Sequence, residues 1–230
     1  MTALSVVFTA YQRPHYLKET LDSWAHVRGI SSISMSIFIE PSDLQDDMIQ
    51  VVHESKLSLD VVLNKERLGV LVNPWRALNF AFFQTDADFT ILAEEDVIVS
   101  SDTLEYFQYQ IDHYSCHDAL GVCAYSGRDK GDTDKTHLSF DFSVLLWGTW
   151  YDNWIDCIKD NWDKDYSTNN GTPGVEAGWD WHLARLSKKF NRPFIHPEVS
   201  RSKHIGEFGG MHTTPETHAA LRCPTFQLNR

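Results

Sequence analysis

The stretch Phe89-Thr90-Ile91-Leu92-Ala93-Glu94-Glu95-Asp96-Val97-Ile98-Val99 combines an apolar run, three consecutive acidic residues and a second apolar run. Three adjacent carboxylates near a core are unfavourable, because like charges repel each other and buried carboxylates lose their hydration. Glu94 and Asp96 are two residues apart, so on an extended chain they project from the same face. Hard oxygen ligands at this spacing suit Mg²⁺ or Mn²⁺, usually shared with substrate phosphates. The stretch therefore predicts a strand that ends at a divalent-metal site, with a solvated turn as the alternative.

Upstream of this stretch, apolar runs alternate with segments of helical spacing. We expect strands at residues 4–9, 34–39, 61–63 and 89–93, and helices at residues 17–27, 48–55 and 73–84. This alternation predicts an α/β fold of Rossmann-like type, with a mostly parallel central sheet and helices on both faces. Ligands of such sheets bind at the carboxyl ends of the strands, which is where Arg13, Glu40, Asp43 and the acidic triplet fall.

Downstream of the triplet the pattern changes. We expect a helix at residues 101–113, strands at 119–125 and 140–150, a helix at 179–189 and a short strand near 194–195. The polar segment 166–178 contains Gly and Pro and is expected to be a loop that faces the acceptor. No repeat or linker is evident, so we expect one domain over residues 1–230, with a nucleotide-binding half at 1–100 and an acceptor-binding half at 101–230.

The composition is that of an acidic protein. The 230 residues carry a formal net charge of −12 and a sequence pI near 5.3, which disfavours sequence-independent binding to nucleic acid. The four cysteines form no CxxC pair and no recognisable zinc spacing, which indicates free thiols in a reducing compartment. The sequence has no run of about 18 apolar residues, so we expect a cytoplasmic protein without a membrane span.

Another acidic residue stands in an aromatic setting. Asp180 lies in the segment Gly178-Trp179-Asp180-Trp181-His182. A metal beside a nucleotide-shaped crevice suggests transfer from a nucleoside diphosphate, in which the metal neutralises the leaving diphosphate and a separate carboxylate deprotonates the incoming hydroxyl. Partial desolvation between two Trp side chains makes a carboxylate a better base. Asp180 is therefore the candidate base, with N-capping of the following helix as the alternative.

Three sequence elements occur in the order and approximate spacing of a known enzyme family. They are Glu94-Glu95-Asp96-Val97-Ile98-Val99-Ser100 followed by Leu104-Glu105-Tyr106-Phe107, then Trp179-Asp180-Trp181, then Pro197-Glu198-Val199-Ser200-Arg201. Over residues 4–212 the chain resembles nucleotide-sugar glycosyltransferases of the GT-A fold. It is most similar to the N-acetylglucosaminyltransferase I family and its relative that acts on O-mannosyl glycans. The resemblance implies a GT-A fold, a nucleotide-sugar donor and an inverting transfer.

The resemblance also implies roles for individual residues. Asp96 would be the direct metal ligand and Asp180 the catalytic base. Arg13 would contact the nucleotide diphosphate or base, and Glu40 or Asp43 would lie at the uracil. Glu94 and Glu95 would contact the sugar or the ribose. The segment 206–212 would form a lid over the donor.

Several side chains late in the sequence are further candidates. Many GT-A enzymes complete the metal site with a C-terminal His, so His204 or His212 would bind the metal through a neutral imidazole nitrogen. The alternative for each is an ordinary surface His in a Gly-rich segment. Arg201 and Lys203 suit a diphosphate, with a solvated face as the alternative.

Four tryptophans are candidates for the acceptor site. Trp147 and Trp150 flank a flexible Gly-containing dipeptide and would form an acceptor platform or pack in the core of the second half. Trp179 and Trp181 stand on either side of the candidate base and would also contact the acceptor.

The sequence thus predicts an inverting glycosyltransferase that uses Mn²⁺ or Mg²⁺. The resemblance alone suggests UDP-GlcNAc as the donor, with a glycan, a protein or another hydroxyl compound as the acceptor. Two alternatives stay open. One is a catalytically silent sugar- or nucleotide-binding module of the same fold, and the other is a glycosyltransferase that acts on a modified nucleobase in DNA, which the net charge disfavours.

Overall fold

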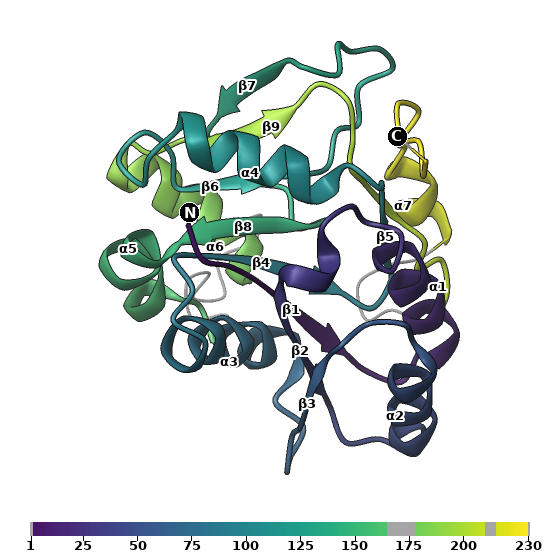
Figure 1. Cartoon of the computed structure of the whole chain (residues 1–230). Coiled ribbons are helices and arrows are strands. Elements are labelled where there is room, and N and C mark those ends of the chain that lie inside the picture. Colours follow the sequence, from purple (N-terminus) through teal and green to yellow (C-terminus); the bar gives the residue numbers. More distant parts are fainter. Residues whose placement is uncertain (1, 165–177, 210–214, 230) are drawn as a thin grey trace.

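An eight-stranded sheet, in the order β3-β2-β1-β4-β8-β6-β9-β7, forms the centre of the computed structural model (Figure 1). The structure describes residues 2–164, 178–209 and 215–229. The strands are β1 (Leu4–Ala10), β2 (Ser34–Ile39), β3 (Asp60–Leu63), β4 (Phe89–Glu94), β6 (Gly121–Cys123), β7 (Thr136–Ser139), β8 (Trp147–Trp150) and β9 (Phe194–Pro197). Strands β3, β2, β1 and β4 are parallel to one another, which confirms the α/β fold predicted from the alternating pattern.

Helices cover both faces of this sheet, as expected (Figure 1). Their bounds are α1 (Pro14–Trp24), α2 (Gln45–Glu54), α3 (Gly69–Gln84), α4 (Thr103–His113), α5 (Tyr151–Asn153), α6 (Trp179–Phe190) and α7 (Pro215–Ala220), with shorter turns at η1 (Ile30–Ser32), η2 (Trp154–Ile158) and η3 (Lys159–Asn161). Within the described residues, none of these helices is long and apolar enough to cross a membrane.

The two faces have separate cores because side chains of a strand alternate between them. On β1, Val6 and Phe8 pack with α1, α2 and α4, whereas Val7 packs on the opposite face with α3 and α6. The larger core contains Trp24 of α1, whose ring meets Phe8 edge-on with centroids 5.4 Å apart. The parallel half of the sheet is therefore buried on both faces, and its ligand-accessible part is the edge at the carboxyl ends of the strands.

A second, two-stranded sheet continues directly from the acidic triplet. Strand β5 (Val97–Val99) follows the triplet and pairs antiparallel with β10 (Ser202–His204). In this register Val97 lies opposite His204, and the Ile205 amide donates to the Asp96 carbonyl at 2.8 Å. The pairing brings a segment more than 100 residues later in the chain beside the triplet, a contact that no local pattern in the sequence predicts.

The second half departs from the expected strands. The segment expected as a strand at 140–150 forms β8 only over its last four residues, and β8 lies antiparallel between β4 and β6. Gly148 permits this pairing, because a Cβ atom there would lie 2.3 Å from the ring of Phe89 and 2.9 Å from the Thr90 carbonyl oxygen. Strands β7 and β10 were not predicted. The expected acceptor loop at 166–178 falls outside the described residues except for Gly178.

Candidate active site

A cavity of about 420 Å³ opens at the carboxyl ends of β1, β2 and β4. From the first half of the chain, the predicted residues Arg13, Glu40 and the triplet Glu94–Asp96 line it. From the second half, Trp179, Asp180, Trp181 and His204 line it. The parallel topology and the β5–β10 pairing therefore bring most of the predicted site residues to one cavity.

Arg13 pairs with two members of the triplet. It lies between the end of β1 and Pro14, the first residue of α1. Its Nη2 is 2.6 Å from Glu95 Oε1, and its Nη1 is 2.8 Å from Asp96 Oδ2. The Thr20 hydroxyl of α1 donates to the Glu95 carbonyl at 2.8 Å, which fixes the turn that carries both carboxylates. One guanidinium thus balances two buried acids.

The three carboxyls differ in how readily they ionise. Burial raises the pKa of Glu95 to about 7, with Asp96 adding to the effect and Arg13 opposing it. Burial also raises the pKa of Glu94 well above its ordinary value, and the charges of Asp96 and Glu95 add to this. Burial acts in the same direction on Asp96, but the hydrogen bond from His204 and the charge of Arg13 outweigh it and lower the pKa of Asp96. Asp96 therefore stays ionised, which is the form that binds a metal ion.

The surroundings of Asp96 fit a divalent cation. His204 Nε2 lies 3.1 Å from Asp96 Oδ2. The backbone at Gly206 approaches so closely that a Cβ atom there would lie 2.1 Å from the same oxygen. Carboxylate oxygen suits Mn²⁺ or Mg²⁺, and a neutral imidazole nitrogen is a common metal ligand that favours a transition metal such as Mn²⁺ over Mg²⁺. The described residues include no cluster of three or more His, Cys, Asp or Glu side chains arranged for a metal.

Glu40 shapes the far end of the cavity. Its carboxylate accepts the backbone N–H groups of Leu68 and Gly69 at 2.8 and 3.0 Å, which anchors the start of α3. Just before this anchor, the Arg67 guanidinium lies 4.3 Å above the centroid of the Tyr11 ring. Tyr11 and Arg67 also line the cavity, although neither was predicted as a site residue. Tyr11 directly follows the first strand, which is the signal that would have identified it.

Asp180 occupies the first turn of α6 without capping it. The residue that precedes the helix is Gly178, whose φ of 116° suits glycine, and Asp180 is the second helical residue. The N-cap alternative is therefore wrong. The first turn of a helix stabilises a negative charge, and Asp180 lines the cavity there. Asp180 also interacts electrostatically with Glu94 across this space.

The four tryptophans have different environments. Trp181 is 45% exposed at the cavity, whereas Trp179 is nearly buried and stacks on Trp162 with centroids 4.9 Å apart. Trp147 and Trp150 lie on opposite faces of β8, within the two separate cores, and neither lines the cavity. The prediction that Trp147 and Trp150 form an acceptor platform is wrong, because both side chains are buried in the core, as the alternative stated.

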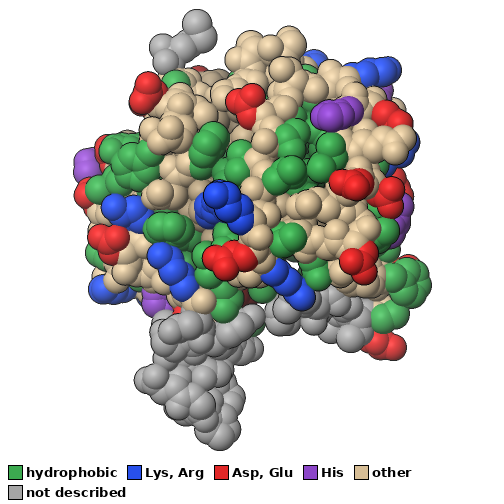
Figure 2. All heavy atoms as spheres, turned by 90° about the horizontal axis from the view of Figure 1, so that it is seen from below, with side chains coloured by type: hydrophobic (Ala, Val, Ile, Leu, Met, Phe, Trp, Pro, Cys, Tyr) green, Lys and Arg blue, Asp and Glu red, His purple; other side chains and the backbone are tan. Residues whose placement is uncertain are grey.

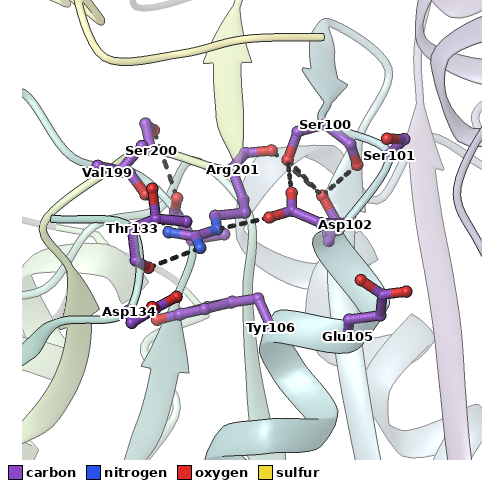
Figure 3. Close-up of polar contacts among 12 residues, drawn as sticks. Ser100, Ser101, Asp102, Glu105, Tyr106, Thr133, Asp134, Val199, Ser200 and Arg201 are labelled. Carbon is purple, nitrogen blue, oxygen red and sulfur yellow. Dashed lines mark hydrogen bonds and ion pairs between the residues drawn. The ribbon is translucent and has the colours of Figure 1, made fainter. Parts of the chain in front are cut away.

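Arg201 is a structural residue and not a diphosphate ligand in this arrangement (Figure 3). It is 4% exposed, and its Nη1 and Nη2 donate to the carbonyls of Val199 and Thr133 at 2.6 and 2.8 Å. Its Nε lies 3.4 Å from Asp102 Oδ2, and its guanidinium packs over the Tyr106 ring. These contacts hold the segment before β10 against α4.

The remaining predicted residues lie elsewhere. Asp43 and Lys203 are exposed and do not line the cavity. Lys203 points away from it because its neighbours on β10, Ser202 and His204, point inward. His212 lies outside the described residues, as does the end of the expected lid at 206–212. Gly209, from the described part of that segment, lines the cavity.

Neither a protein-family model nor a curated protein sequence matches this chain. Several solved structures do match this chain in fold. S. aureus TarS 1–349 matches with a TM-score of 0.63 and 16% identity, over 90% of this chain and 61% of that one. The mannosyltransferase PcManGT from Pyrobaculum calidifontis, solved with GDP-Man and Mn²⁺, matches with a TM-score of 0.56 and 15% identity, over 85% of this chain and 55% of that one. A cytidylyltransferase from Leptospira borgpetersenii matches with a TM-score of 0.55 and 8% identity, over 87% of this chain and 78% of that one.

These matches concern the fold. A TarS 1–349 structure in complex with UDP-GlcNAc matches with a TM-score of 0.57 at 16% identity, over 96% of this chain and 64% of that one. This chain therefore spans about three fifths of the TarS 1–349 chains that it matches. At such identities the comparison does not single out the N-acetylglucosaminyltransferase I family. The chain has the α/β fold of the GT-A-type glycosyltransferases.

Proposed function

We propose that this protein is a metal-dependent, inverting glycosyltransferase with a UDP-sugar donor, UDP-GlcNAc being the first donor to test. The observation that carries the proposal is the convergence on one cavity of an ionised Asp96 beside His204 and of Asp180 from a separate element. Asp96 and His204 suit a metal ion that neutralises the leaving diphosphate, and Asp180 suits the deprotonation of the incoming hydroxyl.

The donor would lie along the carboxyl ends of the strands. Its base would lie near the stacked Tyr11 and Arg67, which offer an aromatic and a planar cationic surface. Its diphosphate would lie at Arg13, whose guanidinium already contacts two carboxylates and has the geometry for phosphate oxygens. Residues 1–100 would thus carry most of the donor site, and His204 would join it from the second half.

Asp96 and His204 would hold the metal ion, which when bound neutralises the charge that develops on the leaving diphosphate. Asp180 would accept the proton of the acceptor hydroxyl as that oxygen attacks the anomeric carbon. A single displacement with one base and no protein nucleophile inverts the anomeric configuration. The exposed ring of Trp181 would support the acceptor beside Asp180.

A hydroxyl group of a glycan or a protein is a better candidate for the acceptor than a modified nucleobase in DNA. Figure 2 shows one face of the molecule, on which Lys and Arg side chains alternate with Asp, Glu and apolar side chains. With a net charge of −12, the chain lacks the basic excess that phosphate contacts along a duplex require. Binding of a glycan or protein acceptor does not require an excess of basic side chains.

The proposal is tested by UDP release from a panel of UDP-sugars, with Mn²⁺ and with EDTA. We expect release with Mn²⁺ that EDTA abolishes, and a loss of about 10²- to 10⁴-fold in Asp180→Asn with UDP binding retained. Asp160→Asn is the matched control, because the Asp160 side chain is 83% exposed and lies outside the cavity. UDP binding without turnover by the wild type would instead identify a silent binding module. Near-normal turnover by Asp180→Asn would overturn the assignment of the base.

A further inference from the structure

The imidazole of His204 contacts a different group at each of its two nitrogens. Nε2 lies 3.1 Å from Asp96 Oδ2, and Nδ1 lies 3.1 Å from Nδ1 of His218. The two rings are tilted at 46° with centroids 5.2 Å apart, so the contact is between ring edges and not a stack. His218 comes from α7 and is half-buried, and no residue of the predicted site suggested it.

The short contact between the two Nδ1 atoms restricts the protons that they carry. A hydrogen bond between two ring nitrogens needs one N–H and one lone pair, so in the neutral pair one Nδ1 donates and the other accepts. When His204 Nε2 donates to Asp96, Nδ1 of His204 is the acceptor and His218 supplies the proton. When His204 Nε2 gives its lone pair to a metal, Nδ1 of His204 carries the proton and donates, and Nδ1 of His218 must accept the hydrogen bond.

The geometry points to His218 as the positioning residue for the metal ligand His204. It holds the ring orientation that directs Nε2 at Asp96, and its Nδ1 accepts the hydrogen bond from the Nδ1–H of a metal-binding His204. His218 itself does not touch the metal. This inference rests on the proposed function, and in particular on a divalent metal bound by Asp96 and His204.

A purely structural role for His218 would predict that α7 depends on it for docking. The chain just after α7 has other attachments. The Tyr125 hydroxyl donates to the Arg222 carbonyl at 2.8 Å, and the Cys223 thiol donates to the Ser202 carbonyl at 3.1 Å. These contacts keep the segment in place without His218, so substitutions at His218 test the ligand and not the fold.

The experiment is a titration of Mn²⁺ followed by the electron paramagnetic resonance signal of the free ion, with UDP present. His218→Phe removes the acceptor, and we expect Mn²⁺ affinity to fall about 10- to 100-fold, as for other hydrogen-bond partners of metal ligands. His218→Asn restores an acceptor oxygen close to the position of Nδ1, and we expect an affinity within about threefold of the wild type on the same principle. His53→Phe, at an exposed position of α2, is the matched control and should leave the affinity unchanged.

Each outcome distinguishes the positioning role from the proposed function. In wild type, nitrogen hyperfine coupling to Mn²⁺ should be present, and it should weaken in His218→Phe and return in His218→Asn. Equal losses of affinity in both variants, or no loss in His218→Phe when His204→Phe loses binding, would overturn the role of His218 while leaving the metal site intact. Absence of Mn²⁺ binding by the wild type would overturn both the metal site and the role of His218. Turnover of UDP-sugars is a separate assay, which tests the transferase activity independently of His218.

Discussion

Arg13 offers a quantitative test of the way in which the acidic triplet is stabilised. The side chains of Arg13, Glu95 and Asp96 are 14%, 8% and 5% exposed, so their ion pairs are screened little by water. Replacing Arg13 by Met keeps much of the apolar stem and leaves two acids without their cation. Removal of one partner from a buried ion pair typically costs about 3–5 kcal/mol.

The lower end of that range applies here. Burial raises the pKa of Glu95 to about 7, so this carboxyl can take up a proton when Arg13 is lost, which limits the penalty. Asp96 retains its hydrogen bond from His204. We therefore expect Arg13→Met to lower the free energy of unfolding by about 3 kcal/mol. For a chain of this size the melting temperature should fall by about 6–12 °C.

The assay is urea unfolding at pH 8 in EDTA, with Arg28→Met as the matched control. Arg28 pairs with Glu105, but these side chains are 48% and 56% exposed, so the control should lose no more than about 1 kcal/mol. Divalent metal should restore more stability to Arg13→Met than to the wild type, because Arg13 Nη1 occupies the Asp96 oxygen that a metal would use. A loss in Arg13→Met no larger than that in Arg28→Met would refute this reasoning.

Three further predictions concern other parts of the structure. Trp147→Ala should lower the free energy of unfolding by about 3–5 kcal/mol, because the side chain is fully buried. Trp181→Ala should change this free energy by no more than about 1 kcal/mol and should reduce transfer to the acceptor. Equal stabilities of the two variants in urea unfolding would contradict the assignment of Trp147 to the core and Trp181 to the site. Gly206→Ala should weaken Mn²⁺ binding at least tenfold in the same paramagnetic titration, since its Cβ would collide with Asp96 Oδ2, and unchanged binding would show that the backbone yields. Burial lowers the pKa of His196 below its ordinary value of 6.5, so near pH 6.5 the unfolded chain takes up a proton that the folded chain does not. The free energy of unfolding should therefore fall as the pH drops from 7.5 to 5.5. Urea unfolding of His196→Gln should show a smaller fall, and an unchanged pH dependence would exclude His196 as its source.

The first half of the fold could be predicted because its signals are local. Each of β1 to β4 is a short apolar run, and each helix between them carries its own periodic pattern. Parallel topology then places the residues after β1, β2 and β4 at one edge, which is why Arg13, Glu40 and Asp96 were expected near one another and do line one cavity. Asp43 was misplaced because it lies only three residues beyond Glu40, yet the chain has already turned outward there.

The second half could not be predicted equally well, because its outcome depends on partners distant in sequence. Trp147 and Arg201 belong to residue types that often bind ligands, but residue type does not reveal whether the partner is a ligand or the protein itself. Trp147 is enclosed when β8 inserts between β4 and β6, and Arg201 pairs with Asp102 and donates hydrogen bonds to two backbone carbonyls. Apart from the contact with the Val199 carbonyl, these contacts join segments that no short sequence pattern connects.

The β5–β10 pairing shows how a small element decides the chemistry of the site. Asp96 and His204 are 108 positions apart, and they meet because Val97 pairs with His204 and Val99 with Ser202. Side chains alternate along a strand, so a slip of one residue would exchange every inward position for an outward one. Lys203 would then face Asp96 in place of His204, giving the carboxylate a cation and removing the imidazole lone pair that a metal needs. A three-residue strand therefore determines whether the ionised carboxylate at the end of β4 can serve a metal or only a salt bridge.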